Sequence, residues 1–383
     1  MESIVAQIKT LAGKDDATRK SVIDALIKLQ HSLETPFELI MRLYNSDFET
    51  VGARMAVDLG IFRALSESEQ PLTVADLAQR SGAAPQLMGR ILRYLASIDM
   101  IDETDKDTFT ANHITKLLAD PDREGGILLS FDVQGPTNQA LPDFLLERQY
   151  QDVVKNTDTA FNRAWKTEQP FFFWVRTQPK LWDILHHALQ VQWRADWLSG
   201  FELTHYLGGW TAQPGDGKVL FVDVGGSMGV QCANLKAKHP DLPGRVILQD
   251  MQEAIDIWKP IDGVEGMAQD YYAEQAVKGA KFYYYRNIFH DNPDESALKI
   301  LAGLRPAFAP HSLLLIDDKV LPDRGVHRHA TMLDLAMMAQ VGSLERTRQQ
   351  WHDLLAKAGW EIIDVVTYDD EYDSVLVVKP ADM

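Results

Sequence analysis

Two neighbouring positions in the C-terminal half of the chain could bind a small ligand together. The stretch Val222–Gly229 reads VDVGGSMG and follows an apolar run, and its glycines let the backbone turn tightly and approach a ligand. By itself, a glycine-rich turn after a strand is as often a plain loop between two elements as a ligand-binding site. Asp250 ends the next apolar run, where a carboxylate can accept both hydroxyls of a ribose. The spacing is neither that of a phosphate-binding P-loop nor Gly-x-Gly-x-x-Gly, so the pair favours a nucleoside without phosphates.

A third position, His290 in the stretch YYYRNIFHDNPDE, could act as a base. The ordinary pKa of histidine, about 6.5, lets an imidazole accept a proton from a hydroxyl at neutral pH. A carboxylate on the other ring nitrogen would fix the tautomer and stabilise the imidazolium that forms. A histidine before an aspartate is, by itself, more often a helix cap or a surface residue, so the role of His290 depends on the pattern around it.

The elements that would position these residues read as a parallel sheet. Four apolar runs without alternation are separated by helix-like segments: KVLFVDVGG, RVILQD, KFYYYRNIF and SLLLIDDKVL. Runs of this kind are typical of strands buried on both faces. The segments WEIIDVVTYD and SVLVVKP have no helix between them and predict a closing hairpin. We therefore expect an α/β fold with a doubly wound, Rossmann-like domain over residues 201–383.

The N-terminal part predicts helices. Residues 1–45 read as polar helices with apolar residues three or four apart, and a further helix is expected from Val51. A helix-turn-helix follows, with Thr73 as an N-cap and Gly82 as a helix stop, and residues 108–110 form a possible wing. This predicts an all-helical, winged-helix-like domain over residues 1–120.

Residues 121–200 are expected to be a helical linker that also forms part of a substrate pocket. They are crowded with aromatic side chains such as Phe131, Trp174 and Trp193. Most of these aromatics are expected in the core, and some are expected to line a flat apolar ligand.

Composition excludes several classes of partner. The 38 Lys and Arg against 55 Asp and Glu give a net charge of -17, which repels nucleic acids and anionic membranes. The single cysteine, Cys232, cannot form an internal disulfide, and the start MESIVAQIKT has acidic and polar residues where a secretory signal needs apolar ones. No apolar run approaches the roughly 20 residues of a membrane span. We expect a cytoplasmic protein without a metal site.

Six motifs in order make the chain resemble a known family, the class I S-adenosylmethionine-dependent O-methyltransferases of the caffeic-acid/flavonoid type, in the form common in fungal secondary metabolism. The motifs are VDVGGSMG, LQD at Asp250, AQDYY at Asp270, YYYRNIFHDNPDE, IDDKVLP at Asp318, and LERT at Glu345 with the following WHDLLAKAGW. The resemblance covers most of the chain. It implies a homodimer formed through the N-terminal domain.

The resemblance also implies roles for individual residues. The cofactor S-adenosylmethionine would be bound by Asp223, Gly225, Gly226, Gly229, Asp250, Asp270, Tyr271 and Arg286. Among these, Asp250 would hold the ribose, Asp270 and Tyr271 would flank the adenine, and Arg286 would lie near the cofactor carboxylate. His290 matches the general base, and Asp318 and Glu345 match the two acidic residues that flank it, Asp318 standing where the plant enzymes have Glu.

The acceptor implied is a phenolic or enolic hydroxyl of a small aromatic, polyketide-like or alkaloid-like metabolite. Its pocket walls would include Phe131, Trp174, Met332, Leu335, Met338 and Gln340. The methionine-rich helix among them is more often simple core, but methionines also adapt to an irregular ligand.

Two departures from the family pattern affect cofactor binding. Asn292 stands where the family usually has a tryptophan, and Ser227-Met228 stands where Gly-Thr is common. One of the tyrosines at 283–285 could supply an aromatic face in place of the tryptophan.

Two further functions stay open. One is a cofactor-dependent pericyclase or dehydratase on the same fold, and the other is a winged-helix regulator that binds DNA. The net charge disfavours the regulator.

Overall fold

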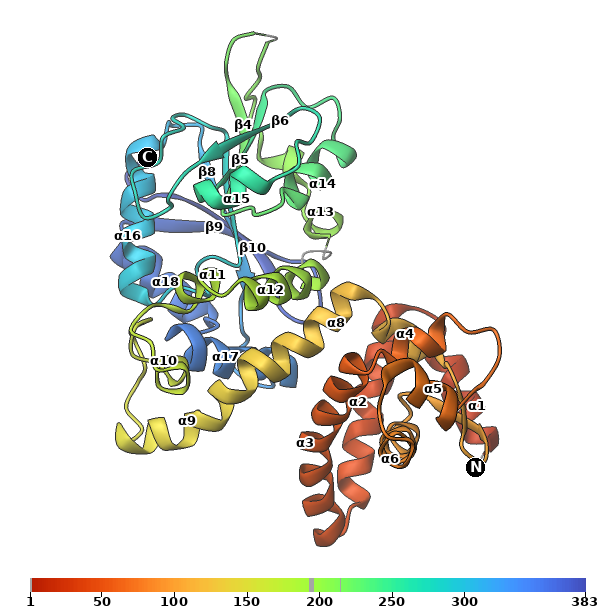
Figure 1. Cartoon of the computed structure of the whole chain (residues 1–383). Coiled ribbons are helices and arrows are strands. Elements are labelled where there is room, and N and C mark those ends of the chain that lie inside the picture. The colour runs from red at the N-terminus through yellow and green to blue at the C-terminus, as the bar shows by residue number, and fades with distance from the viewer. Residues whose placement is uncertain (1, 193–195, 214) are drawn as a thin grey trace. The chain divides into compact units, whose positions relative to one another are not determined.

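The computed structural model describes residues 2–192, 196–213 and 215–383 and divides into two compact units (Figure 1). The N-terminal unit comprises Met1–Phe131 and Ile184–Ala188, and the C-terminal unit comprises Asp132–Asp183 and Leu189–Met383. Within the expected linker at 121–200, residues 193–195 lie outside the described residues, and with them Trp193.

Three long helices open the N-terminal unit: α1 (Glu2–Ala12), α2 (Asp16–Leu33) and α3 (Pro36–Asp58). The sequence predicted helices here, but α3 runs without a break through residues 45–51. Its buried face begins only at Gly52, so the apolar spacing changes within one helix. The chain then turns at Gly60, whose φ of 64° suits glycine, into α4 (Ile61–Ser66).

The expected helix-turn-helix and wing are confirmed. Helices α5 (Val74–Ser81) and α6 (Pro85–Ser97) meet at Gly82 with φ 74°, and Thr73 caps α5 by a reciprocal capping box with Asp76. Strands β1 (Leu72–Thr73), β2 (Asp102–Asp105) and β3 (Thr108–Thr110) form a small sheet in the order β1-β3-β2. Helices α7 (His113–Leu118) and α8 (Pro121–Leu128) complete the unit.

A further set of helices leads into the C-terminal unit: η1 (Leu129–Gln134), α9 (Gly135–Glu147), α10 (Ala160–Trp165), α11 (Phe171–Arg176), α12 (Pro179–Gln192), α13 (Trp197–Gly200) and η2 (Leu203–Tyr206). Their aromatic side chains pack on one another. The ring of Phe161, for example, lies 5.1 Å from that of Phe171 and 5.5 Å from that of Trp174. Edge-to-face contacts of this kind are typical of an aromatic core.

The doubly wound domain is a seven-stranded sheet in the order β6-β5-β4-β7-β8-β10-β9. Its strands are β4 (Val219–Val224), β5 (Arg245–Asp250), β6 (Val264–Ala268), β7 (Phe282–Arg286), β8 (Leu313–Lys319), β9 (Trp360–Thr367) and β10 (Asp373–Pro380). All neighbours pair in parallel except β10, which runs antiparallel to β8 and β9 as the expected hairpin requires. The strand order reverses between β4 and β7, so a ligand is expected at the carboxyl ends of these two strands.

Helices cover both faces of the sheet. On one face α16 (Asp294–Leu304), η3 (Arg305–Ala307) and α18 (Arg348–Lys357) pack on a core that includes Tyr283 and Tyr285. On the other face α13 and α14 (Val230–Lys238) pack on a core that includes Tyr284. The hypothesis that one of these tyrosines offers an aromatic face to a cofactor is wrong, because the strand directs their rings into the two cores. Helices α15 (Gln252–Ile257) and α17 (Arg328–Val341) follow β5 and β8.

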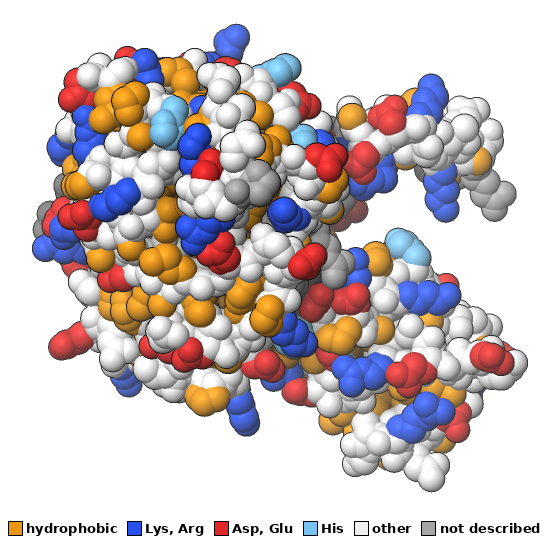
Figure 2. All heavy atoms as spheres, turned by 90° about the horizontal axis from the view of Figure 1, so that it is seen from above, with side chains coloured by type: hydrophobic (Ala, Val, Ile, Leu, Met, Phe, Trp, Pro, Cys, Tyr) orange, Lys and Arg blue, Asp and Glu red, His pale blue; other side chains and the backbone are white. Residues whose placement is uncertain are grey.

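The surface carries charged side chains of both signs (Figure 2). Figure 2 shows acidic and basic side chains interspersed on the face it presents, with no extended basic patch there for a nucleic acid. Across the described residues, no helix combines the length and the apolar character needed to cross a bilayer. The same residues contain no group of three or more His, Cys, Asp or Glu side chains placed to hold a metal ion.

Candidate active site

The glycine loop lies at the carboxyl end of β4 and is held against β5. The N–H groups of Gly225 and Gly226 both donate to the Gln249 carbonyl, at 2.8 and 3.2 Å. Gly225 has φ 75°, and a Cβ on Gly226 would lie 2.5 Å from the carboxylate of Asp223 and 2.6 Å from Leu248 Cδ1. Only glycine fits this turn, since any side chain would push the loop away from the strand ends.

Asp250, at the end of β5, is tied to the same loop. Its Oδ2 accepts from the Ser227 N–H at 2.8 Å, and its Oδ1 accepts from the Met251 N–H at 2.7 Å. Burial raises the pKa of Asp250, and these two backbone donors lower it in part. Each carboxylate oxygen keeps a free lone pair, so two hydroxyls of a ribose could still donate to it.

A small cavity at the switch point joins the ends of β4 and β7. It is lined by Asp223, Gly225, Gly226, Ser227, Val230, Gln231, Arg286 and Asn287. Asp223 lies at its base with the side chain buried, and burial raises the pKa of this carboxyl to about 7. The residues at the ends of β4 and β7, which the sequence analysis treated one by one, therefore line the same cavity.

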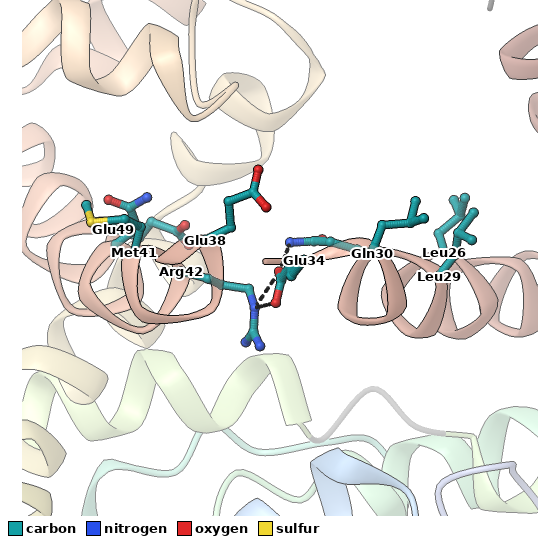
Figure 3. A pocket seen from close by; sticks show the side chains of 10 residues that line it. Leu26, Leu29, Gln30, Glu34, Glu38, Met41, Arg42 and Glu49 are labelled. Carbon is teal, nitrogen blue, oxygen red and sulfur yellow. Dashed lines mark hydrogen bonds and ion pairs between the residues drawn. The ribbon is translucent and has the colours of Figure 1, made fainter. Parts of the chain in front are cut away.

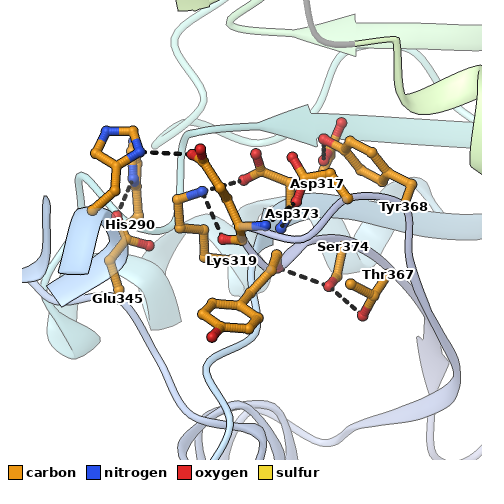
Figure 4. A network of polar contacts seen from close by, with 12 residues as sticks. His290, Asp317, Lys319, Glu345, Thr367, Tyr368, Asp373 and Ser374 are labelled. Carbon is orange, nitrogen blue, oxygen red and sulfur yellow. Dashed lines mark hydrogen bonds and ion pairs between the residues drawn. The ribbon is translucent and has the colours of Figure 1, made fainter. Parts of the chain in front are cut away.

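Arg286 lines this cavity but is engaged in a buried network. Its Nη1 donates to Asp317 Oδ2 at 3.1 Å, and Asp317 also accepts from the Tyr284 hydroxyl. The Tyr368 hydroxyl donates to Asp317 Oδ1 at 2.7 Å (Figure 4). Burial lowers the pKa of Arg286, but the Asp317 carboxylate more than offsets this, and the net shift is upward. The guanidinium therefore stays charged at the edge of the cavity.

Tyr271 brings an aromatic ring to the glycine loop. Its Cδ1 lies 3.9 Å from where a Cβ on Gly225 would stand, and its ring contacts that of Tyr272 edge to face at 4.8 Å. Asp270 is exposed and accepts from the Tyr272 N–H at 2.9 Å. The structure thus places Tyr271, but not the carboxylate of Asp270, against the loop.

Asn292 has a role that the sequence did not reveal. It is buried, its Nδ2 donates to the Ile288 carbonyl at 2.6 Å, and its Oδ1 accepts from the Tyr272 hydroxyl. Where the family pattern has a stacking tryptophan, this chain has a polar link between the segment that carries His290 and the tyrosine pair.

His290 lies close to two carboxylate side chains. Its Nδ1 is 2.8 Å from Glu345 Oε1 (Figure 4). Its Nε2 is 3.6 Å from Asp291 Oδ1. The imidazole side chain is 12% exposed and that of Glu345 is fully buried. The contact to Glu345 fixes the ring, as the sequence predicts, while Asp291 was not predicted to take part.

These carboxylates set the charge of the imidazole. Burial lowers the pKa of His290, but Asp291 and Glu345 raise it by more, to about 10. Burial raises the pKa of Asp291 to about 6 and that of Asp318 well above its ordinary value. Both oxygens of Asp318 are buried without a hydrogen-bond partner among the described residues.

Arg346 positions the segment that carries His290. It is buried, and its guanidinium donates to the carbonyls of Phe289 and Asn292 at 2.8 and 2.9 Å and to Asp294 Oδ1 at 2.8 Å. These three bonds fix the backbone on both sides of His290. Its place directly after Glu345 was the only signal available in the sequence.

We predict that Arg346→Ala destabilises the protein by about 2 kcal/mol, because it leaves two buried carbonyls without a donor. Chemical denaturation of the variant would measure the loss. Arg348→Ala removes an exposed arginine two residues later and should change stability by less than about 0.5 kcal/mol. Equal stability of the two variants would contradict the assignment.

The expected substrate residues lie in different settings. Met332 and Leu335 of α17 are 54% and 56% exposed, whereas Met338 packs against the core formed by α9, α10 and α17. Gln340 is buried, with its amide Nε2 unpartnered among the described residues, and Trp174 packs against Trp165 at 4.9 Å. Phe131 belongs to the N-terminal unit and is 36% exposed.

Two family models match the chain. An O-methyltransferase dimerisation domain matches residues 52–120, and an O-methyltransferase domain matches residues 216–361. The first match spans the helix-turn-helix and wing, which gives that region a part in dimerisation in place of the DNA binding that the regulator hypothesis requires.

Similar proteins cover nearly the whole chain. The 16-O-methyltransferase bsc6 of Alternaria brassicicola is 56% identical over 98% of this chain and 95% of its own length. A solved structure described as a pericyclic reaction enzyme and the structure of LepI in complex with S-adenosylmethionine each give a TM-score of 0.95 at 39% identity, over 99% of this chain and 98% of the other.

Proposed function

We propose the function of this chain from an established premise: it belongs to the O-methyltransferase family. It is an S-adenosylmethionine-dependent enzyme that methylates a phenolic or enolic hydroxyl of a small secondary metabolite of polyketide-like or alkaloid-like character. The observation that carries this proposal is the fixed imidazole of His290, held at 2.8 Å by Glu345 on the segment that follows β7, one of the two strands at the switch point.

The residues at the switch point fit the cofactor. Asp250 is a partly buried carboxylate with no cation among its hydrogen-bond partners, as a ribose-binding residue should be. Tyr271 offers a ring beside the glycine loop, and Arg286 offers a positive charge at the cavity edge. Asp223, Gly226 and Gly229 shape the loop, and Asp270 is the exposed member of the set. LepI, with 39% identity, has been solved with S-adenosylmethionine bound.

The chain's own residues handle the proton. Bound S-adenosylmethionine supplies an electrophilic methyl group on a sulfonium. Nε2 of neutral His290 takes the proton from the acceptor hydroxyl, while Glu345 holds Nδ1 and so selects the tautomer. The imidazolium that results is stabilised by Glu345 and Asp291. General-base help of this kind is worth roughly 10²–10⁴ in rate.

The raised pKa of His290 makes a prediction about pH. Because the imidazole must be neutral to accept a proton and its pKa is about 10, kcat/KM should keep rising with pH above neutrality. Asp291→Asn removes a carboxylate that raises this pKa, so the acid limb should move to lower pH. If kcat/KM levelled off near the ordinary histidine pKa in both proteins, the carboxylates around His290 would not raise its pKa as proposed.

The proposal is tested by incubating the protein with S-adenosylmethionine and a panel of phenolic and enolic metabolites. Mass spectrometry should find S-adenosylhomocysteine and a product heavier by one methylene group. Failure with every acceptor, despite calorimetric binding of the cofactor, would count against methyl transfer.

A second function is favoured by one observation, the TM-score of 0.95 to a pericyclic reaction enzyme. In that case the cofactor is bound but not consumed, and the buried Asn292 in place of the stacking tryptophan belongs to a pocket adapted to that use. The product would be isomeric with the substrate, or smaller by one water for a dehydratase, and no S-adenosylhomocysteine would accumulate.

The organisation of the chain completes the proposal. Residues 1–120 form the dimerisation domain of a homodimer, residues 121–200 link it to the catalytic domain and contribute Trp174 to the pocket, and residues 201–383 bind the cofactor. Met332, Leu335, Met338, Gln340 and Phe131 are the other proposed pocket residues. The single cysteine, buried in α14, suits a reducing cytoplasm.

A further inference from the structure

Hollows in the two units have linings of opposite charge. The groove between α2 and α3 of the N-terminal unit is lined by three glutamates and one arginine beside apolar side chains (Figure 3). A cavity of about 240 Å³ in the C-terminal unit is lined by Lys281, Lys379 and His311, and by no Asp or Glu among the described residues. In a chain with a net charge of -17, a cavity whose charged side chains are all basic favours an anion.

This second cavity lies at the edge of the sheet opposite the glycine loop. Lys281 directly precedes β7, Leu313 begins β8, and Pro380 ends the antiparallel β10. The proposed cofactor residues stand at the other ends of β4 and β7. The cavity is therefore separate from the candidate active site, and none of the residues that line it serves the proposed reaction.

Lys281 is a buried cation in this cavity. The residue is 4% exposed, and its backbone is fixed by hydrogen bonds to Val219 and Leu313 on the two neighbouring strands, at 2.9 and 2.8 Å. Its Nζ donates to the His311 carbonyl at 2.8 Å and lies 5.2 Å from the centre of the Phe282 ring. That leaves two of its three N–H groups for another acceptor. Burial lowers the pKa of Lys281 to about 8, and no carboxylate among the described residues offsets this.

The other two basic groups are engaged further. Lys379 Nζ pairs with Glu361 Oε1 at 3.1 Å and donates to the Met383 backbone oxygen at 3.3 Å, so its charge is partly offset. His311 Nε2 donates to a backbone carbonyl at 3.0 Å, since a carbonyl oxygen can only accept. Among the described residues that line the cavity, Lys281 thus carries the charge that is least offset, and Lys379 adds a second one.

We propose that this cavity binds a small doubly charged oxyanion, with the ammonium group of Lys281 as its main partner and Lys379 as a second cation. Inorganic phosphate and a short dicarboxylate share this chemistry, because both present several acceptor oxygens on a compact dianion. The volume of about 240 Å³ suits a group of this size and is below the roughly 300–1,000 Å³ typical of sites for larger ligands. The bound anion supplies the counter-charge that the buried lysine lacks. The inference does not depend on methyl transfer.

Calorimetry tests the proposal with inorganic phosphate and, separately, with malonate, while chloride keeps the ionic strength constant. Lys281→Met keeps the apolar stem but removes the charge, and should raise the dissociation constant by about 10-fold or more. Lys379→Met should weaken binding less, because Glu361 already offsets that charge. Lys278→Met removes an exposed lysine outside the cavity, paired with Glu274, and should change nothing. Binding of only one of the two probes would identify the class of oxyanion.

Proton uptake tests the site in the unaltered protein, in case Lys281→Met does not fold by circular dichroism. At about one pH unit above the pKa of about 8, most of Lys281 is neutral, and an oxyanion that binds its charged form must draw in a proton. Calorimetry in buffers of different ionisation enthalpy should find this uptake in the wild type and not in Lys281→Met. The affinity of the wild type should also fall as the pH rises above 8.

Several results would overturn the proposal. They are no binding of either probe at constant ionic strength, binding to the wild type without proton uptake, and equal affinity of the wild type and Lys281→Met. Equal losses in Lys281→Met and Lys278→Met would also contradict it, because the anion would then respond to the net charge of the protein and not to this cavity.

Discussion

His290→Ala should lower kcat by roughly 10²–10⁴ and leave cofactor affinity nearly unchanged. In the proposed mechanism the imidazole takes the acceptor's proton, and Glu345 holds its Nδ1 at 2.8 Å. Its contacts are with carboxylates and not with the glycine loop, so the nucleoside site should not change. Single-turnover assays with saturating cofactor would measure the loss.

Three controls separate the base from its surroundings. His352→Ala removes an exposed histidine of α18 and should have no effect on the rate. Asp318→Asn should do less harm than His290→Ala, because it removes charge support for the imidazole but leaves the base in place. An acceptor whose hydroxyl is already ionised should react at similar rates with wild type and with His290→Ala. A near wild-type rate in His290→Ala with the natural acceptor would remove His290 as the base.

Asp250→Ala should weaken the binding of S-adenosylhomocysteine by about 10- to 150-fold, which corresponds to about 1.5–3 kcal/mol for hydrogen bonds to a charged group. The variant also removes the acceptor that holds the Ser227 N–H at 2.8 Å, so the loop and the ribose site are lost together. Isothermal calorimetry with S-adenosylhomocysteine measures this without turnover.

The matched control for Asp250 is Asp256→Ala. Asp256 is exposed on α15, a few residues along the chain, and its Oδ1 accepts from the Gln252 side chain on the same helix. Its removal should leave affinity unchanged. If both variants bind as the wild type does, the ribose assignment is wrong; if both lose binding equally, the loss comes from the general acidity of this edge and not from one carboxylate.

The buried strands themselves could be predicted because parallel strands buried on both faces leave continuous apolar runs. Strand β6 was missed for the opposite reason. It reads VEGMA, pairs only with β5 at the sheet edge, and has a single buried residue, Val264. A run with one buried position gives no apolar signal, so only the hydrogen-bond register reveals it.

The sequence predicted the ends of a long helix less well where the helix passes from an exposed to a buried environment. Helix α3 exposes its first four turns and buries Gly52, Ala53 and Ala56 only near its end. The spacing of apolar residues changes along α3 and so suggested two helices, although residues 45–51 contain no residue typical of a helix end. Turn chemistry was more reliable: Thr73 and Gly82 act where their backbone preferences require.

In the site, residue types were predicted better than their arrangement. The glycine loop and Asp250 follow from chemistry that needs such residues at strand ends, and the pairing of His290 with Glu345 follows from the family resemblance. Asp291 and Arg346 could not be predicted, because their parts depend on how the segment after β7 folds back toward the residues beyond α17. The roles of all these residues in cofactor and substrate binding stay predictions.

The most direct test of methyl transfer uses S-adenosylmethionine with a deuterated methyl group. With the natural acceptor, mass spectrometry should find the labelled methyl in the product and one S-adenosylhomocysteine for each product molecule, and His290→Ala should slow both together. An unlabelled product, isomeric with the substrate, formed while the labelled cofactor stays intact, would contradict methyl transfer and show that this chain uses its cofactor for rearrangement.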